Sequence, residues 1–149
     1  MGANRKGQIL VPFQISLLTH VHRAIYVVSR GHLAGGTMVG LQIVMLTTTG
    51  RKSGRRRTIP LNALADGDRW VIVASNGGQP THPQWYLNLL ANPAVGLEVR
   101  RQKFTAAARK ATPAEKATLW PRIIARVKNY EGYQSKTVRD IPLVVLTRI

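Results

Sequence analysis

The residues best suited to chemistry in this sequence gather in one basic segment. Five cations and two glycines occupy eight consecutive positions, Gly50-Arg51-Lys52-Ser53-Gly54-Arg55-Arg56-Arg57. Glycine lets backbone N–H groups come close to an anion, and Arg and Lys side chains bind phosphate or carboxylate oxygens. The segment therefore predicts one of two things: a site for a phosphorylated or carboxylated ligand, or an exposed turn that its charges keep soluble.

A second candidate follows an apolar run and consists of Ser75-Asn76-Gly77-Gly78. Successive backbone amides and a hydroxyl group in such a loop can hold a ring carbonyl or another anion. Many ordinary loops also contain a pair of glycines, so this sequence by itself leaves both interpretations open.

Four aromatic residues are able to line a site for a planar ligand. Trp85 and Tyr86 belong to a short predicted helix, where packing in the core is the favoured interpretation. Tyr130 and Tyr133 lie in the polar stretch 129–134, which we interpret as a turn that does not require burial. For these two tyrosines, ligand binding and packing both remain open.

The sequence lacks the residues and motifs that several kinds of catalysis require. Cysteine is absent, which excludes disulfides, thiolate catalysis and iron–sulfur sites and makes a cytoplasmic location the expected one. No Walker loop, dinucleotide-binding glycine fingerprint or serine nucleophile elbow is present. No metal site is predicted either, because no carboxylate stands at ligand spacing from the four histidines, His20, His22, His32 and His82.

The charge balance points to an anionic partner. The 149 residues include 22 Lys and Arg but 6 Asp and Glu, a formal net charge of +16. Such an excess attracts nucleic acid, anionic lipid or an acidic cofactor. Because no apolar run reaches the roughly 20 residues of a membrane-spanning helix, a soluble or membrane-peripheral protein is expected.

The positions of these residues depend on a series of short predicted elements. Pro12 to Arg30 has the periodicity of an amphipathic helix, which would cover the core or lie on a membrane surface, and a glycine-rich connection follows up to residue 40. Asp66-Gly67-Asp68 predicts a tight hairpin turn. Apolar runs and alternating apolar residues predict the strands 43–46, 58–64, 70–75, 95–99, 104–109 and 141–147. A proline at its start indicates a helix over residues 83–91, and the capping box Thr112 to Glu115 indicates another from residue 113 onward.

Several antiparallel strands with interspersed helices, and no repeated strand–helix–strand unit, predict an α+β domain built round a barrel or a curved sheet. We expect one such domain over residues 41–149, preceded by the helix and connection of residues 1–40.

Four separated blocks, in order along the chain, resemble the deazaflavin-dependent nitroreductase family. They are Leu46 to Gly54, Val73 to Gly78, His82 to Leu89, and Tyr133-Gln134 with Arg139 to Pro142. The resemblance covers nearly everything from Leu41 onward. It implies a split β-barrel that binds coenzyme F(420), whose phosphodiester and glutamate tail the basic segment would neutralise, and that reduces quinones, enones or nitroaromatic compounds.

The resemblance also implies roles for single residues. The phosphate and acidic tail would contact Arg51, Lys52, Ser53, Arg55 and Arg57, whereas the ring would lie near Ser75, Asn76, Gly77, Gly78 and Trp85. Tyr130 and Tyr133 would line the acceptor pocket. A tyrosine of ordinary pKa stays protonated near neutral pH and can donate a proton to an oxygen that gains charge as hydride arrives.

Other functions compete with this one. FMN is a possible cofactor of the fold, but it has a single phosphate and the basic segment exceeds what that needs. Nucleic-acid binding is disfavoured, because aromatic residues do not alternate with the basic run as in a stacking surface. A protein that binds F(420) or a lipid without catalysis remains an alternative, as does peripheral contact with an anionic membrane through the N-terminal helix. The sequence does not indicate the oligomeric state.

Overall fold

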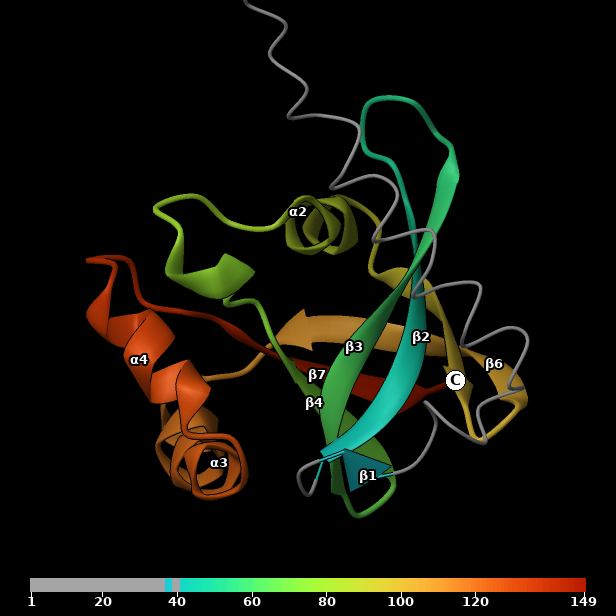
Figure 1. The fold of residues 1–149 in the computed structure, drawn as a ribbon. Helices are drawn as coiled ribbons and strands as arrows, with labels where there is room; N and C mark the ends of the chain where they lie inside the picture. Colours follow the sequence, from blue (N-terminus) through green and yellow to red (C-terminus); the bar gives the residue numbers. More distant parts are fainter. Residues whose placement is uncertain (1–36, 39–40) are drawn as a thin grey trace, which may run out of the picture.

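The computed structural model describes residues 37–38 and 41–149, and in this part of the chain a β-barrel is flanked by helices (Figure 1). The strands are β1 (Thr37–Met38), β2 (Leu41–Thr49), β3 (Arg56–Asp66), β4 (Arg69–Val73), β5 (Ala94–Val99), β6 (Gln102–Lys110) and β7 (Leu143–Arg148). The helices are the 3-10 turn η1 (Asn76–Gly78), α2 (Gln84–Ala91), α3 (Pro113–Arg126) and α4 (Asn129–Ser135).

The sheet closes on itself. Its strands run antiparallel in the order β1-β2-β3-β4-β7-β6-β5, and β2 also pairs with β5, where Leu46 stands opposite Leu97. Strands β2 to β7 therefore form a closed barrel, and the predicted split β-barrel of antiparallel strands with peripheral helices is confirmed. Closure leaves β2 and β5 without an open edge at the point where they meet.

The hairpins are close to their predicted places. Gly67 takes the positive φ of 64° that the turn between β3 and β4 requires. The turn between β5 and β6 falls at Arg100 and Arg101, between the predicted strands 95–99 and 104–109. Strand β2 spans Leu41–Thr49 and is longer at both ends than the predicted strand 43–46. Across the ladder, the Thr47 and Thr58 hydroxyl oxygens lie 2.7 Å apart, and β-branched residues favour strands.

Two hydrophobic clusters share β4 and β7. Ile72 and Val144 point into the barrel, while their neighbours Val71 and Val145 point outward and are covered by α3 and α4. Successive side chains of a strand alternate between its two faces, so burial on both faces requires an unbroken apolar run. This double burial explains why these two strands lack polar alternation.

Helices α2 and α3 confirm their predictions. Tyr86 and Leu89 of α2 are buried in the barrel cluster, so α2 covers one end of the barrel (Figure 1). Helix α3 begins with a complete capping box: the Glu115 backbone N–H donates to the Thr112 hydroxyl, and the Thr112 N–H donates to the Glu115 carboxylate. The Arg122 guanidinium of α3 donates to Asp66 at the end of β3, which holds the helix against the barrel.

The interpretation of residues 129–134 as a turn that does not require burial is wrong. They form most of α4, and Tyr130 is 9% exposed within the outer hydrophobic cluster. Tyr130 and Tyr133 are three residues apart, so the helix puts both rings on one face. The apolar surface of β4 and β7, which local sequence does not reveal, is what buries this face.

The predicted helix of residues 12–30 lies outside the described residues. Within the predicted glycine-rich connection, Thr37 and Met38 form the short strand β1, which pairs with Gln42 and Leu41 at the start of β2. None of the helices formed by residues 37–38 and 41–149 is long and apolar enough to cross a membrane.

Candidate functional site

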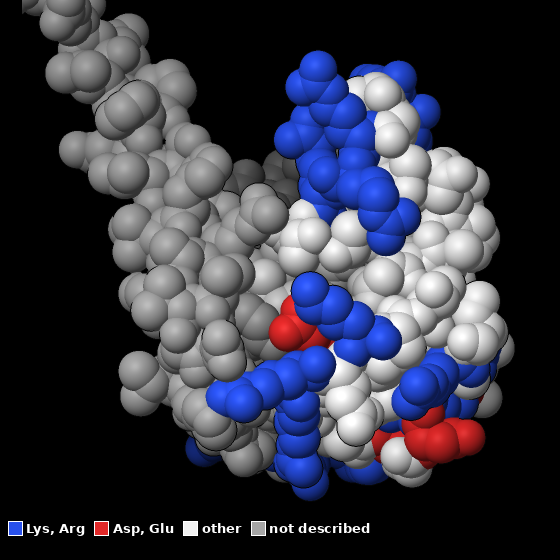
Figure 2. Space-filling view, turned by 90° about the vertical axis from the view of Figure 1, so that its right-hand side faces the viewer, with Lys and Arg blue, Asp and Glu red and all other residues white. Residues whose placement is uncertain are grey.

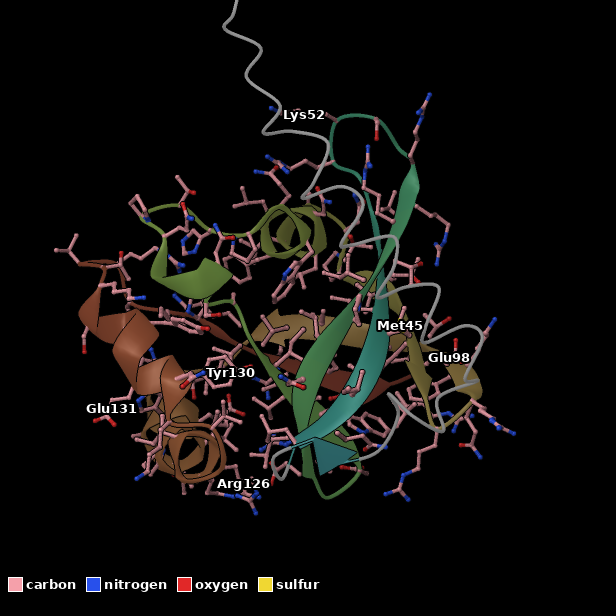
Figure 3. The ribbon with its side chains drawn as sticks, in the orientation of Figure 1. Met45, Lys52, Glu98, Arg126, Tyr130 and Glu131 are labelled. Atoms are coloured by element: carbon pink, nitrogen blue, oxygen red, sulfur yellow. The ribbon has the colours of Figure 1, made fainter. Side chains whose placement is uncertain are left out.

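The basic segment forms the loop between β2 and β3 and projects beyond the barrel. On the face shown in Figure 2, its Lys and Arg side chains form the blue group at the top, and Figure 3 places Lys52 at the tip of the loop. Lys52, Ser53, Arg55 and Arg57 are all exposed. Their positions leave the cationic groups free to meet a ligand from solvent.

The loop has a defined backbone despite its exposure. The Gly50 N–H donates to the Arg55 carbonyl at 2.7 Å, and the Gly54 N–H donates to the Gly50 carbonyl at 2.8 Å. Gly54 has a φ of 70°, a left-handed conformation that favours glycine. A Cβ at Gly50 would lie 2.6 Å from the Ser53 hydroxyl oxygen and 3.3 Å from the Arg55 carbonyl oxygen, so a larger residue there would require the Ser53 side chain to move.

Arg51 connects this loop to α2. Its backbone N–H donates to the Asn88 side-chain oxygen at 3.1 Å, and its guanidinium donates to the same oxygen and to Gln84 Oε1, each at 3.0 Å. Asn88 is 5% exposed, so its oxygen is a buried acceptor that Arg51 satisfies. Arg51 thus holds the loop in place while the remaining cations stay available.

None of the five cations of the basic segment has an acidic counterpart among the described residues. Within residues 37–38 and 41–149, Lys52, Arg55 and Arg57 form no side-chain hydrogen bond or ion pair. The acidic residues that form ion pairs do so with other cations, those acids being Asp66, Glu98, Glu115 and Asp140. An anion bound at the loop would therefore neutralise charge that this part of the chain leaves uncompensated.

The second candidate segment forms a turn between β4 and α2 that we call the glycine turn, residues 74–79. Three successive residues have positive φ: Asn76 at 46°, Gly77 at 64° and Gly78 at 78°. The Gly78 N–H donates to the Ser75 carbonyl at 2.9 Å, and the Asn76 side-chain amide donates to the Thr81 carbonyl at 3.0 Å. The turn therefore has a rigid, tightly bonded shape.

The glycine turn is in direct contact with α4. A Cβ on Gly78 would lie 2.7 Å from the Tyr133 carbonyl oxygen and 3.0 Å from its Cα. The structure thus brings Gly78 and Tyr133 together across more than fifty residues of sequence. A Cβ on Gly77 would meet no described atom within 4 Å, so Gly77 faces open space.

Arg139 fastens the glycine turn from the other side. Its guanidinium donates to the carbonyls of Ser75 at 2.6 Å, Gln79 at 2.9 Å and Ala74 at 3.2 Å. It also lies 3.1 Å from Nδ1 of His82. Burial, followed by the charges of Arg139 and Lys110, lowers the pKa of His82. A neutral His82 can accept the Arg139 N–H through Nδ1.

The two tyrosines differ in exposure. Tyr130 lies between α4 and the barrel (Figure 3). Burial raises its pKa, while a hydrogen bond with Asn62 of β3 opposes that rise. Tyr133 is half-buried; its ring meets the Tyr130 ring edge-on at 6.1 Å, and the Lys136 ammonium lies 5.5 Å from its centroid. Tyr133 is therefore the tyrosine that a ligand reaches more easily.

Helix α2 joins the two candidate segments. Its residues Gln84 and Asn88 hold Arg51 of the basic loop, while His82, two residues before the helix, contacts Arg139 beside the glycine turn. Trp85 is half-buried and packs on the barrel cluster, with its ring edge-on to Tyr86 at 6.3 Å. The basic loop, α2, the glycine turn and α4 thus form one connected side of the molecule.

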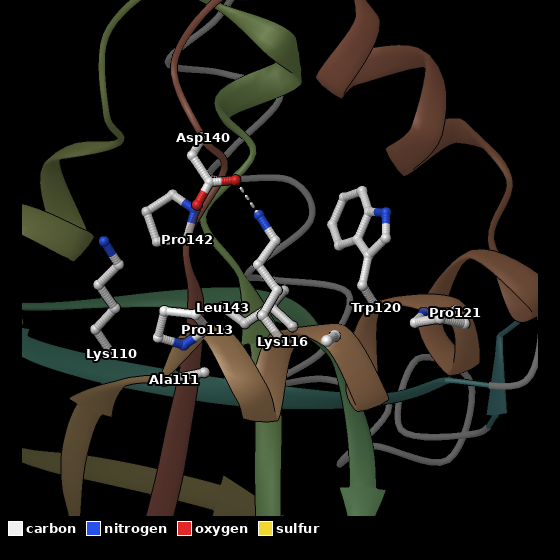
Figure 4. Close-up of a pocket in the computed structure, with 10 residues that line it drawn as sticks. Lys110, Ala111, Pro113, Lys116, Trp120, Pro121, Asp140, Pro142 and Leu143 are labelled. Carbon is white, nitrogen blue, oxygen red and sulfur yellow. Dashed lines mark hydrogen bonds and ion pairs between the residues drawn. The ribbon is translucent and has the colours of Figure 1, made fainter.

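A cavity of about 540 Å³ contains none of the predicted site residues (Figure 4). Lys116 crosses it between Asp140 and the Trp120 ring. A second cavity of about 460 Å³ on the outer face of β2 and β5 includes Arg56 and Gly96. Within residues 37–38 and 41–149, no group of three or more His, Asp or Glu is placed to hold a metal ion.

Three residues on the side formed by the basic loop, α2, the glycine turn and α4 were not identified as site residues from the sequence. Asn88 interrupts the apolar run of α2, and a lone amide in such a run is a signal that could have identified it. Arg139 and Gln134 occurred only inside a resembling block. No spacing rule connects Arg139 to acceptors that lie far away in sequence, or Gln134 to its partners Arg139 and Ile141.

Comparisons with known proteins agree with one another. A family model described as F(420)H(2)-dependent quinone reductase matches residues 18–148. An F(420)H(2)-dependent quinone reductase of Mycobacterium tuberculosis is 40% identical over 134 residues, which cover 88% of this chain and 90% of that protein.

Solved structures resemble the fold at similar identity. An F(420)H(2)-dependent reductase, FDR-A, is 37% identical with a TM-score of 0.64, over 70% of this chain and 92% of its own. A chain described as a domain-swapped dimer is 30% identical with a TM-score of 0.68, over 88% of this chain and 98% of its own.

Proposed function

Because the chain belongs to the F(420)H(2)-dependent quinone reductase family and is an F(420)H(2)-dependent oxidoreductase, we propose how its residues divide the binding of coenzyme and acceptor. The basic loop binds the anionic part of the coenzyme, the glycine turn with Trp85 binds its ring, and the tyrosines of α4 line the acceptor side. The observation that carries this assignment is the continuous side formed by the basic loop, α2, the glycine turn and α4.

The basic loop suits a phosphate with a tail of carboxylates. Lys52, Arg55 and Arg57 are exposed and have no partner in the described part of the chain, so a polyanion can bind them without breaking an ion pair there. Guanidinium groups bind phosphate and carboxylate through paired hydrogen bonds. Ser53 adds a hydroxyl group, while Arg51 acts by fixing the loop to α2.

The glycine turn suits a planar ring with polar edges. Ser75 is 9% exposed, and Asn76, Gly77 and Gly78 present a backbone that carries no bulky side chain beyond the Asn76 amide. Backbone can therefore approach the ring closely, and Trp85 supplies an aromatic wall next to it.

The chemical step requires little of the protein beyond orientation. The reduced coenzyme, when bound, supplies a hydride to the acceptor. For a quinone acceptor, the oxygen that gains charge takes up a proton, and we assign its donation to the hydroxyl group of the half-buried Tyr133. Tyr130 supports the Tyr133 ring and keeps the acceptor side apolar.

The proposal also covers the acceptor, the domain division and the place where catalysis occurs. A quinone is the acceptor that we favour over an enone or a nitroaromatic compound, in keeping with the family. We keep the predicted division into residues 1–40 and a barrel domain of residues 41–149, although Thr37 and Met38 already pair with β2. The basic, apolar periodicity of residues 12–30 suits contact with an anionic membrane in which a quinone dissolves. Catalysis would then occur in the cytoplasm, at the inner face of the membrane.

Equilibrium binding of F(420), FMN and duplex DNA at near-physiological salt tests the cofactor. We expect F(420) to bind most tightly, and its reduced form to be oxidised by a soluble quinone. Tight binding of F(420) without oxidation by any quinone would leave a binding protein that is not an enzyme. Preference for FMN or DNA would contradict the assignment of the basic loop.

Substitution of Tyr133 by Phe tests the acceptor side. We expect turnover with a quinone to fall about tenfold or more, while the Kd for F(420) changes little, because a positioned acid acts in the chemical step. Single-turnover oxidation of the reduced coenzyme measures the step directly. Tyr130→Phe, which removes the hydroxyl facing Asn62, is the matched variant and should lower stability more than turnover. Equal turnover of Tyr133→Phe and the unaltered protein would remove Tyr133 from the mechanism.

A further inference from the structure

The glycine turn has a conformation that the chain does not favour without support. Three consecutive residues lie at positive φ, and one of them, Asn76, carries a side chain. Glycine and asparagine adopt this region as single residues, so three such residues in succession persist only when surrounding contacts hold them. The contacts that hold it therefore determine the shape of the site.

Arg139 supplies three of these contacts from one side chain. Its side chain binds both limbs of the turn, through Ala74 and Ser75 on the β4 side and through Gln79 on the α2 side. Four N–H···acceptor contacts, including the one to His82, use nearly all the donors of one guanidinium. A lysine has a single ammonium centre and cannot reproduce this planar fork.

The backbone of Arg139 is itself fixed to α4. The Gln134 side-chain amide donates to the Arg139 carbonyl at 2.8 Å, and its oxygen accepts the Ile141 N–H at 2.9 Å. Gln134 follows Tyr133 directly on the helix. The turn also touches α4 through Gly78, so Arg139 completes a closed circuit of contacts between the turn and the helix.

We infer that Arg139 is a positioning residue for hydride transfer: together with Gln134 it sets the spacing between the turn that holds the coenzyme ring and the helix that lines the acceptor side. This inference rests on the proposed function. Four of the five N–H donors of the guanidinium are directed at the protein, so Arg139 acts through the glycine turn and not as a ligand of the coenzyme. It should therefore affect both ring binding and the alignment of the two reactants.

Arg139→Lys and Arg139→Gln test the inference by two measurements, the Kd for F(420) and the single-turnover rate with a quinone. Both variants should raise the Kd about tenfold and lower the rate about tenfold, since small misplacements of reactants cost large factors in rate. Arg69→Gln is the control: Arg69 also makes side-chain bonds, to Asp66 and Glu115, but in contacts remote from the turn. It should lower the thermal midpoint and leave the Kd and the rate within about twofold.

Two further results separate positioning from mere stability. Free guanidinium ion at millimolar concentration should partly restore F(420) binding to Arg139→Gln but not alter Arg69→Gln. If neither Arg139 variant folds, Gln134→Leu carries the test, and its single-turnover rate should fall although the turn keeps Arg139. Normal F(420) binding and rate in folded Arg139 variants would overturn the inference, whereas an unaltered protein that fails to bind F(420) would overturn the proposed function instead.

Discussion

The basic loop and the glycine turn serve the same proposed ligand but are built in opposite ways. The loop is exposed, and its side chains Lys52, Arg55 and Arg57 make no internal bonds in the described part of the chain. The turn is packed on α4, and Arg139 bonds its carbonyls from the other side. One segment offers charge on free side chains, and the other offers a rigid backbone.

This difference shows how one site can meet two requirements. A flexible anionic tail needs attraction over several ångströms, which adaptable cations provide without a fixed geometry. A ring that delivers hydride needs an exact position, which a backbone held by many bonds provides. Changes in the turn should therefore alter fold and chemistry together, whereas changes in the loop should alter affinity alone.

Gly78→Ala should have the largest effect, because it disturbs the packing of the rigid glycine turn. The new Cβ would meet the Tyr133 backbone at 2.7 Å and sit at a φ of 78°. We expect a loss of at least about 2 kcal/mol in the free energy of unfolding, together with loss of F(420) binding. Chemical denaturation and coenzyme titration measure the two effects.

Gly77→Ala is the matched control for that substitution. Gly77 has a similar φ of 64° but open space where a Cβ would stand, so the cost should be limited to about 1 kcal/mol of backbone strain. Equal losses for the two variants would show that contact with α4 contributes nothing, and the contrast between turn and loop would lose its basis.

Arg55→Gln and Arg57→Gln should have an intermediate effect that is confined to the coenzyme. Each is expected to raise the Kd for F(420) about three- to tenfold and to make binding less sensitive to salt, because one charge that attracts the tail is gone. The thermal midpoint should not change, since neither side chain makes a bond to another described residue. Titration at two salt concentrations measures the loss of affinity.

Arg100→Gln controls for net charge. Arg100 is exposed on the turn between β5 and β6. Strand β5 runs antiparallel to β2 with Glu98 opposite Met45, so this turn lies toward the start of β2, at the end away from the basic loop. Its loss should leave the Kd nearly unchanged. If it weakens F(420) binding as much as Arg55→Gln does, the overall charge of the molecule, and not the loop, attracts the coenzyme.

The change in protein stability with pH that His82 causes should be the smallest of these effects. His82 is faced by the Arg139 guanidinium and, at longer range, by Lys110, and its ring lies 4.9 Å from that of Tyr86. Its folded pKa is below the 6.5 of an ordinary histidine. Unfolding therefore takes up a proton as pH falls below about 6.5, and stability declines until the folded pKa is passed.

We expect this decline to be less than about 1 kcal/mol between about pH 7.5 and about pH 5. Urea unfolding at the two pH values measures it, and His82→Gln, which keeps an acceptor for Arg139 but does not titrate, should remove part of the difference. The lowered pKa values of Asp66 and Glu115 affect stability mainly in more acidic solution, and comparison with His82→Gln separates His82 from the other titrating groups. An unchanged pH dependence in His82→Gln would exclude His82 as its source.

Much of the fold was available from local patterns. The turn at Gly67, the capping box of Thr112 and Glu115, and the proline that precedes α2 are each defined by residues a few positions apart, and each is confirmed. Local patterns failed at α4, because Tyr130 and Gly132 in a polar stretch give no strong helical period. Its helical state depends on the buried surface that β4 and β7 supply from elsewhere in the chain.

The candidate site likewise has one part that the local sequence predicts and another that depends on the tertiary structure. The sequence by itself determined which residues carry charge and which allow a tight backbone: the cations of residues 51–57 and the glycines Gly77 and Gly78 stand next to one another in the chain. Only the tertiary structure decided that Arg51 is held by Asn88 and that Arg139 holds the glycine turn. Those contacts join residues 37 to 65 positions apart. Partners at such separations meet only once the barrel has closed, and no local preference of the chain specifies them.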